Sequence, residues 1–381
     1  MKFNWKKCLV GILCIVGFTL FLIKINQFEK ATLVSTTGQS YEKAVVTEIT
    51  KDNLAEDGNR YGTQEVRVYI KTGKFAGEEY DAVNPSGSLF GTDCYVGSKV
   101  IVIVSATGDN SIVTVYSQDR TGAIYLFAAF FALVVCLIGG KKGVKAIASL
   151  VFTFICIYYL MFPLIYKGVS PIAITIVIAF LSTLVTLGLL GGMTAKTASA
   201  IIGTTAGVVI AAVAALLFGK AAGITGYNVS DIETLNYVAQ NSQIRIGQLL
   251  FSGIIIASLG ATMDVGMSIA STIQEIHDRN PELGTKELFL SGIRVGRDMM
   301  GTMTNTLIFA YVGGSLSTLV INYAYDLSYR QLMNSYIIGT EIMQGLSGSL
   351  GVVLTVPVTA VIASVLVARF PKTTANSGLS T

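Results

Sequence analysis

Histidine and charged residues are scarce in this sequence. A single histidine, His277, occurs among the 381 residues, which excludes a metal site built from a histidine cluster. No Walker loop, HExxH or GxSxG motif is present, so the signatures of the commonest phosphate-binding, zinc-peptidase and serine-hydrolase sites are missing. We therefore expect no enzymatic activity and no cofactor, and we expect His277 to be a solvated residue of a polar loop.

Charge is low and unevenly placed. Charged residues make up 13% of the chain and hydrophobic residues 52%, whereas a soluble domain is typically about 25% charged. Residues 26–120 are ordinarily polar, but 121–370 consists of long apolar stretches separated by short polar breaks. This pattern predicts an α-helical polytopic membrane protein with a small β-rich domain inserted after its first helix.

The five cysteines and the net charge of +4 indicate no disulfide framework and no nucleic-acid partner. Four cysteines lie in apolar segments, so Cys94 has no disulfide partner within the polar region. The basic residues flank apolar segments, where the preference of Lys and Arg for the cytoplasmic side of a membrane explains them. The partner that the composition predicts is the lipid bilayer.

The first 120 residues predict an anchor followed by a β domain. A basic start and the apolar run 8–25, with no small-residue cleavage pattern after it, favour an uncleaved anchor helix over 1–25. Residues 26–120 carry short alternating runs, as in Val66–Ile70, and predict a small SH3-like or OB-like barrel with a structural or partner-docking role. The predicted strands are Lys43–Thr50, Gln64–Lys71, Glu79–Val83, Lys99–Ser105 and Ile112–Tyr116.

Seven further apolar segments in 121–370 each approach the roughly 20 residues that cross about 30 Å of hydrocarbon. With the anchor they predict about eight transmembrane helices, and 371–381 is left as a short tail. The amphipathic segment 329–347 is interfacial, re-entrant or part of the last span. The seven predicted spans are 122–140, 146–166, 171–191, 197–218, 247–269, 300–321 and 345–368.

The distribution of Lys and Arg gives an independent prediction of topology. With the N-terminus inside, few basic residues fall in the short outside loops, namely Lys167, Lys220, Arg245 and Arg330. The inside set is larger and comprises Lys2, Lys6, Lys7, Lys141, Lys142, Lys145, Lys196, Arg279, Lys286, Arg294, Arg297, Arg369 and Lys372. Both termini are therefore expected in the cytoplasm and residues 26–120 on the extracytoplasmic face.

Ionisable side chains in apolar helices are the candidates for function, because a charge at the bilayer centre costs at least about 2.5–3.5 kcal/mol. Asp264 forms one polar stripe with Ser268, Ser271 and Glu275 at helical spacing. We expect Asp264 to have an interior functional role or to contact a partner. The alternative is an interfacial carboxylate near the cytoplasmic helix end.

A second cluster enters the seventh predicted span. Arg294, Arg297, Asp298 and Asn305 lie roughly along one helix face. The two arginines can be ordinary orientation anchors, and Asn305 is expected to bond a neighbouring helix. If the sixth and seventh spans pack as an antiparallel pair, Asp264 can form an ion pair with Arg294 or Arg297, as a structural staple or as a gate.

Two further features are a candidate functional residue near the last span and a small-residue motif for helix packing. Glu341, with Gln344, is a candidate on the extracytoplasmic side of the last span. The small residues of Gly203-x-x-x-Gly207 and Ala211-x-x-x-Ala215 permit close helix contact without implying a function.

The segments LGATMDVGMSIAS (259–271) and GRDMMGTMTNTLIFAYVGG (296–314) resemble the YibE/F family of bacterial multi-pass membrane proteins. The anchor, the outer domain and the Gly-rich middle spans resemble its larger, YibE-type members. The resemblance implies a location in the bacterial plasma membrane and a smaller YibF-like membrane partner, with a homo-oligomer as the alternative. It implies no catalytic residues.

Polar positions inside Gly-rich helices favour a transporter or permease component, because a hydrated path through a bilayer needs such positions. The alternative is a non-transporting scaffold or envelope assembly factor whose outer barrel docks a partner. A third reading is an intramembrane hydrolase in which Asp264 and Asp298 form a carboxylate dyad. A continuous polar cavity near Asp264 that reaches both faces would favour transport over the scaffold.

Overall fold

The computed structural model describes residues 5–28, 30, 33, 36–56, 60–85, 92–107, 110–227 and 231–369. The chain divides into two compact units. We call residues 32–135 the barrel unit, and residues 1–31 with 136–381 the helical unit.

The barrel unit contains the five strands that the sequence predicts. They are β1 (Gln39–Lys51), β2 (Gln64–Ile70), β3 (Glu79–Asn84), β4 (Lys99–Thr107) and β5 (Asn110–Gln118). The strands close into a barrel in the order β1-β2-β3-β5-β4, and β3 pairs with β5 in parallel while the other pairs are antiparallel. This is the five-stranded Greek-key arrangement of the OB type, which decides between the two predicted barrels.

Side-chain alternation builds the barrel core. Along β2, Val66, Val68 and Ile70 are buried while Glu65 and Tyr69 are exposed, because successive side chains of a strand point to opposite faces. The interior is filled mainly by branched aliphatic residues that these strands bring together, and a one-residue slip in register would move them into water.

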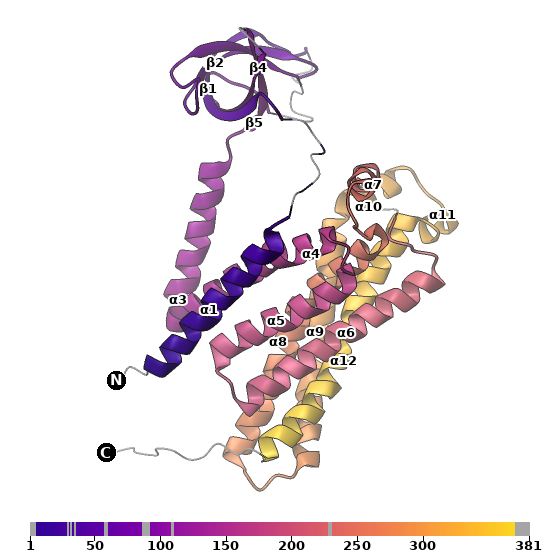
Figure 1. The fold of residues 1–381 in the computed structure, drawn as a ribbon. Coiled ribbons are helices and arrows are strands. Elements are labelled where there is room, and N and C mark those ends of the chain that lie inside the picture. Colours follow the sequence, from indigo (N-terminus) through magenta and orange to yellow (C-terminus); the bar gives the residue numbers. More distant parts are fainter. Residues whose placement is uncertain are drawn as a thin grey trace. The chain divides into compact units, whose positions relative to one another are not determined.

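The rest of the described chain is almost entirely helical (Figure 1). The long helices are α1 (Trp5–Asn26), α3 (Thr121–Ile155), α5 (Pro171–Gly191), α6 (Ala195–Ala221), α8 (Leu249–Arg279), α9 (Thr285–Gly314) and α12 (Tyr336–Arg369). Shorter pieces are the π-helical turn Cys156–Met161, α4 (Phe162–Tyr166), α7 (Ile232–Gln240), the 3-10 turn Ile246–Gln248, α10 (Leu316–Ala324) and α11 (Tyr329–Met333).

Five helical stretches among the described residues are long and apolar enough to cross a membrane, and a bent pair makes up to six. The predicted count of eight is not confirmed. The predicted spans 122–140 and 146–166 lie in one 46-residue helical stretch, Thr121–Tyr166, which a non-helical residue, Gly140, divides at φ 52° and ψ −131°. The predicted anchor falls in α1, and among the described residues its stretch Val16–Asn26 is apolar.

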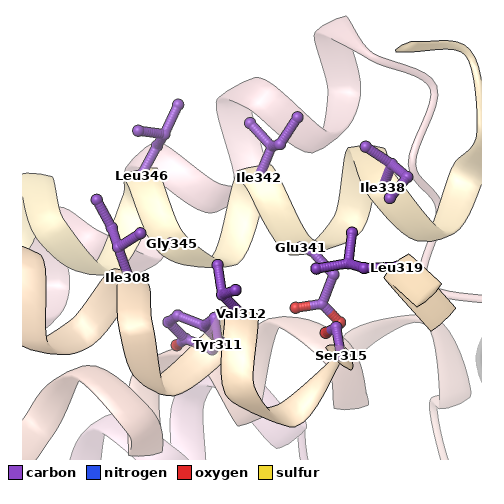
Figure 2. A pocket seen from close by; sticks show the side chains of 10 residues that line it. All are labelled: Ile308, Tyr311, Val312, Ser315, Leu319, Ile338, Glu341, Ile342, Gly345 and Leu346. Carbon is purple, nitrogen blue, oxygen red and sulfur yellow. The ribbon is translucent and has the colours of Figure 1, made fainter. Parts of the chain in front are cut away.

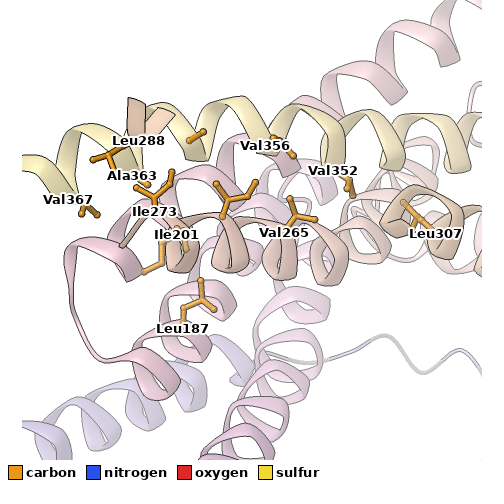
Figure 3. Close-up of a cluster of buried hydrophobic side chains, with 14 residues drawn as sticks. Leu187, Ile201, Val265, Ile273, Leu288, Leu307, Val352, Val356, Ala363 and Val367 are labelled. Carbon is orange, nitrogen blue, oxygen red and sulfur yellow. The ribbon is translucent and has the colours of Figure 1, made fainter. Parts of the chain in front are cut away.

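Close contact between α6 and α12 holds the helical unit together. A Cβ at Gly203 would lie 1.9 Å from Oγ1 of Thr359, and one at Gly207 would lie 1.8 Å from Oγ1 of Thr355. The predicted close-packing role of the Gly203-x-x-x-Gly207 motif is therefore confirmed. Around this contact, α5, α6, α8, α9 and α12 contribute to one cluster of buried aliphatic side chains (Figure 3).

The predicted span 300–321 is not one straight helix. It is divided between α9 and α10, which meet at Ser315 and are bent by 63°. Two consecutive glycines, Gly313 and Gly314, precede the bend, and glycine is the residue least favoured in a helix interior apart from proline. A broken helix of this kind leaves backbone groups without helical partners, which is tolerated at membrane depth only inside protein or beside a water-filled cavity.

The amphipathic segment 329–347 is also divided. Its first part forms α11, and the residues from Tyr336 onward belong to the same continuous helix as the predicted last span, α12. This helix of 34 residues is about 50 Å long at 1.5 Å per residue, which exceeds the roughly 30 Å of a hydrocarbon core.

Candidate functional site

A cavity of about 240 Å³ lies beside the α9–α10 break, between these helices and the start of α12. Its exposed wall is almost entirely apolar, and Tyr311, Ser315 and Glu341 are the residues with polar side chains among those that line it (Figure 2). The apolar wall is contributed by Ile308, Val312, Leu319, Ile338, Ile342 and Leu346. The polar atoms of these three residues contribute almost nothing to the exposed surface, so the cavity is an apolar site with the Glu341 residue in its wall.

Glu341 is the only ionisable carboxylate in the wall of this cavity. It lies in the second turn of α12 and is half-buried, and Figure 2 shows its carboxylate directed from α12 toward the end of α9 where Ser315 lies. Among the described residues Glu341 has no hydrogen-bond or ion-pair partner. A carboxylate kept in apolar surroundings without a partner lowers stability, so the position is explained better by binding than by folding.

Tyr311 adds a second unsatisfied group. Its hydroxyl oxygen is buried and has no hydrogen-bond partner in the described part of the chain, and the same holds for Oγ1 of Thr304. These residues are seven apart on α9 and so lie on the same helix face. Buried polar atoms are normally hydrogen-bonded, so two unpaired hydroxyls on this face, one of them in the cavity wall, indicate water or a ligand there.

The helix break brings two helix ends of opposite polarity together. The C-terminal end of a helix carries a partial negative charge of about half an elementary charge and the N-terminal end an equal positive one, and here α9 ends at Gly314 while α10 begins at Leu316. The full negative charge that suits a cation or a proton is therefore that of the Glu341 carboxylate, with the Ser315 side chain beside it. Among the described residues there is no group of three or more His, Cys, Asp or Glu side chains that could hold a metal ion.

Asp264 lies elsewhere and does not line this cavity. It is on an outward face of α8, where Gly253, Ala257 and Gly260 are also exposed. The predicted stripe continues toward the helix end, where Ser268 and Ser271 are half-buried and Glu275 is exposed and paired with Arg279.

The second predicted cluster is likewise on an open face. Arg294, Arg297, Asp298 and Asn305 are all exposed on α9, and none has an ion pair or hydrogen bond to another described side chain. The predicted ion pair between Asp264 and Arg294 or Arg297 is absent from the structure. The physical reason is that α8 and α9 contact one another through other faces, where Gly296 meets Ile269 and Gly292 meets Ile273.

His277 corrects a further expectation. It is not in a solvated loop but in the last turn of α8, where its side chain is buried and Nδ1 lacks a partner among the described residues. A loop was predicted because the sequence around it is polar. The helix instead continues to Arg279.

Sequence reasoning missed the helix break and Tyr311. The pair Gly313-Gly314 inside an apolar run was the available signal for a break. It also missed an exposed aromatic pair on the barrel, where Tyr41 and Tyr116 pack edge to face with ring centroids 5.3 Å apart. These residues come from strands that are not neighbours in the sequence, so only the barrel brings them together.

Comparison with known protein families identifies the chain. The family model described as YibE/F-like protein matches residues 127–369, which include both segments on which the sequence resemblance rests. No curated protein and no solved structure matches the chain.

Proposed function

We propose that this chain, which belongs to the YibE/F-like protein family, is a transporter or permease component of a membrane. Family membership and the apolar helices support a membrane protein. The transport role, the substrate class and the location in the bacterial plasma membrane are parts of the proposal. We propose no enzymatic activity.

The observation that carries this proposal is the unpaired Glu341 carboxylate in an apolar cavity at a broken helix. Broken helices place backbone carbonyls and helix ends around ions in secondary transporters. Glu341 lies toward one end of α12, so we assign it to the outer part of a route. There it binds a cation or a proton, and the hydroxyl of Ser315, toward which the carboxylate points, supplies a further oxygen for a bound cation (Figure 2).

The proposed topology keeps both termini in the cytoplasm and the barrel unit outside. Its support is the excess of Lys and Arg in the predicted inside segments.

The test is a flux measurement in proteoliposomes that contain the purified chain. We expect flux of protons or of a small monovalent or divalent cation, and we expect Glu341→Gln to abolish it, because the neutral amide does not attract positive charge. The matched control is Glu282→Gln in the exposed loop between α8 and α9, which should keep wild-type flux. Absence of cation or proton flux from wild-type liposomes, with the chain folded, contradicts the proposal.

A second candidate is the scaffold, and the exposed Tyr41–Tyr116 pair favours it. Exposed aromatic rings are enriched where proteins bind one another. A smaller YibF-like membrane protein is the partner that the family resemblance implies. If Tyr41→Ser releases such a partner from the purified complex while flux is absent from all preparations, the scaffold is the better account.

A further inference from the structure

One face of α8 and one face of α9 are open and carry charge. On α8, Gly253, Ala257, Gly260 and Asp264 recur at helical spacing and all are exposed. A Cβ built on Gly253 or Gly260 meets nothing within 4 Å. These glycines therefore differ from Gly203 and Gly207 of α6, which are required by contacts inside the chain.

The face on α9 has the same character. Arg294, Arg297, Asp298, Gly301 and Asn305 all lie on it and are exposed, and a Cβ at Gly301 also meets nothing within 4 Å. Side chains separated by three, four or seven residues share one side of a helix. No contact within the described chain explains why these positions are small or polar.

The register between α8 and α9 fixes which residues share a depth. Gly296 meets Ile269, and Gly292 meets Ile273, so a step of four residues along one helix is matched by a step of four in the opposite direction along the other. Continued along both helices, this antiparallel register places Asp264 level with Gly301. Arg297 then lies one turn, about 6 Å, from the level of Asp264.

Unpaired charges on an exposed face of a membrane-crossing helix need protein or water around them in place of lipid. Ionisable residues in such helices almost always face protein or a water-filled cavity, because lipid does not solvate them. α8 belongs to a stretch that is long and apolar enough to cross a membrane. Asp264, Arg294, Arg297 and Asp298 have no hydrogen-bond or ion-pair partner among the described residues, so no described part of this chain neutralises them.

We propose that a second copy of this chain covers the open faces of α8 and α9, with Asp264 of each copy paired to Arg297 of the other. Together the two faces carry two positive and two negative side chains, so they can be complementary to the same faces of an identical copy, as a two-fold interface requires. Two copies inserted in the same direction are related by an axis along the membrane normal, so residues meet at equal depth. The long arginine side chain spans the one-turn offset, and the open glycines allow the backbones to approach.

The test separates a pair between copies from a pair within one chain. In Asp264→Arg chains the contact of two identical copies brings two arginines together, and in Arg297→Asp chains it brings two aspartates together. Either variant alone should lose dimer in lipid nanodiscs, by about tenfold or more in the dimerisation constant. When the two variants carry different tags and are co-expressed, both contacts become opposite in sign, and we expect the tags to co-purify again.

If the dimer is restored only when both substitutions are in the same chain, and not after co-expression of the two variants, Asp264 and Arg297 pair within one chain. That result would overturn the proposal. Retention of dimer by either single variant would overturn it as well.

A second measurement does not depend on charged variants. In a chain without its natural cysteines, Gly301→Cys should form a disulfide-linked dimer, whereas Val361→Cys, exposed on α12, should not. Failure of Gly301→Cys to cross-link, or its cross-linking to a different protein, contradicts the proposal.

Discussion

Glu341 shows how a single residue separates stability from function. An unpaired carboxylate in a half-buried apolar cavity is destabilising, whereas the same group is what a cation or proton site needs. Asp264 also has no partner among the described residues, but it is exposed on α8 and lines no described cavity. The two residues therefore have different expected partners, a ligand for Glu341 and a second protein chain for Asp264.

Replacement of Glu341 by leucine should stabilise the protein and inactivate it. The change removes an unpaired charge from an aliphatic wall, and we expect the free energy of unfolding to rise by about 1 kcal/mol. Thermal unfolding of the variant in nanodiscs measures this, with Glu282→Leu in the exposed loop as the control. A clear loss of stability in Glu341→Leu would show that the carboxylate has a structural partner.

Cys94 of the barrel unit should be chemically inert in the folded protein. Its side chain is fully buried, and burial, together with the negative charge of Asp93, raises the pKa of the thiol to about 11. The thiolate that reacts with alkylating reagents is therefore nearly absent at pH 8, whereas an exposed cysteine has a pKa near 8.5.

The measurement uses a chain in which the other four cysteines are replaced. Cys94 should stay unlabelled by iodoacetamide at pH 8 in the native protein and should label after unfolding in denaturant. Labelling of the native chain at the rate of the unfolded chain would contradict the buried position.

At the scale of the element, the contact between α6 and α12 depends on the close approach of the two helices at Gly207. A Cβ at Gly207 would lie 1.8 Å from Oγ1 of Thr355 and 3.0 Å from the backbone oxygen of Gly351. Alanine is favoured over glycine in a helix by about 1 kcal/mol, but overpacking typically costs about 1–3 kcal/mol. Because a backbone atom must move, we expect Gly207→Ala to lower stability.

The matched control is Gly122→Ala in α3, where a Cβ meets nothing within 4 Å. That variant should be neutral or slightly stabilised. Adding Thr355→Ala to Gly207→Ala should restore part of the loss, because the nearest atom is removed while the Gly351 oxygen stays. Equal thermal stability of Gly207→Ala and wild type in nanodiscs would contradict this expectation, because it would show that the two helices can move apart without a loss of stability.

Helices and strands were predicted correctly where the local sequence pattern determines them. The five strands follow from alternation and from glycine-bounded ends, and the small-residue motif of α6 indicated a close contact. The bend at Ser315 was missed, because the mean hydropathy of an apolar run does not show where the run stops being one straight helix, whereas the predicted end of the span 122–140 coincides with the non-helical Gly140. The Asp264 ion pair was wrong for a related reason. Sequence spacing defines a face of α8 but not which neighbour that face meets.

At the scale of the whole molecule, the topology can be tested by labelling from outside. Cysteines introduced at Glu79 in β3 and Asn236 in α7, both exposed, should react with an impermeant thiol reagent in intact cells. A cysteine at Asn280, between α8 and α9, should react only after the membrane is opened. Labelling of position 280 in intact cells would contradict the proposed orientation.

The most direct test of the transport route is access to the helix break from both sides of the membrane. Ser315, at the bend and in the cavity wall, is replaced by cysteine in a chain without its natural cysteines. The modification rate is then measured with an impermeant reagent applied outside or inside sealed proteoliposomes of known orientation. A route predicts reaction from each side in turn, slowed by the transported cation or proton. Reaction from one side only, unaffected by cations and pH, would contradict the account.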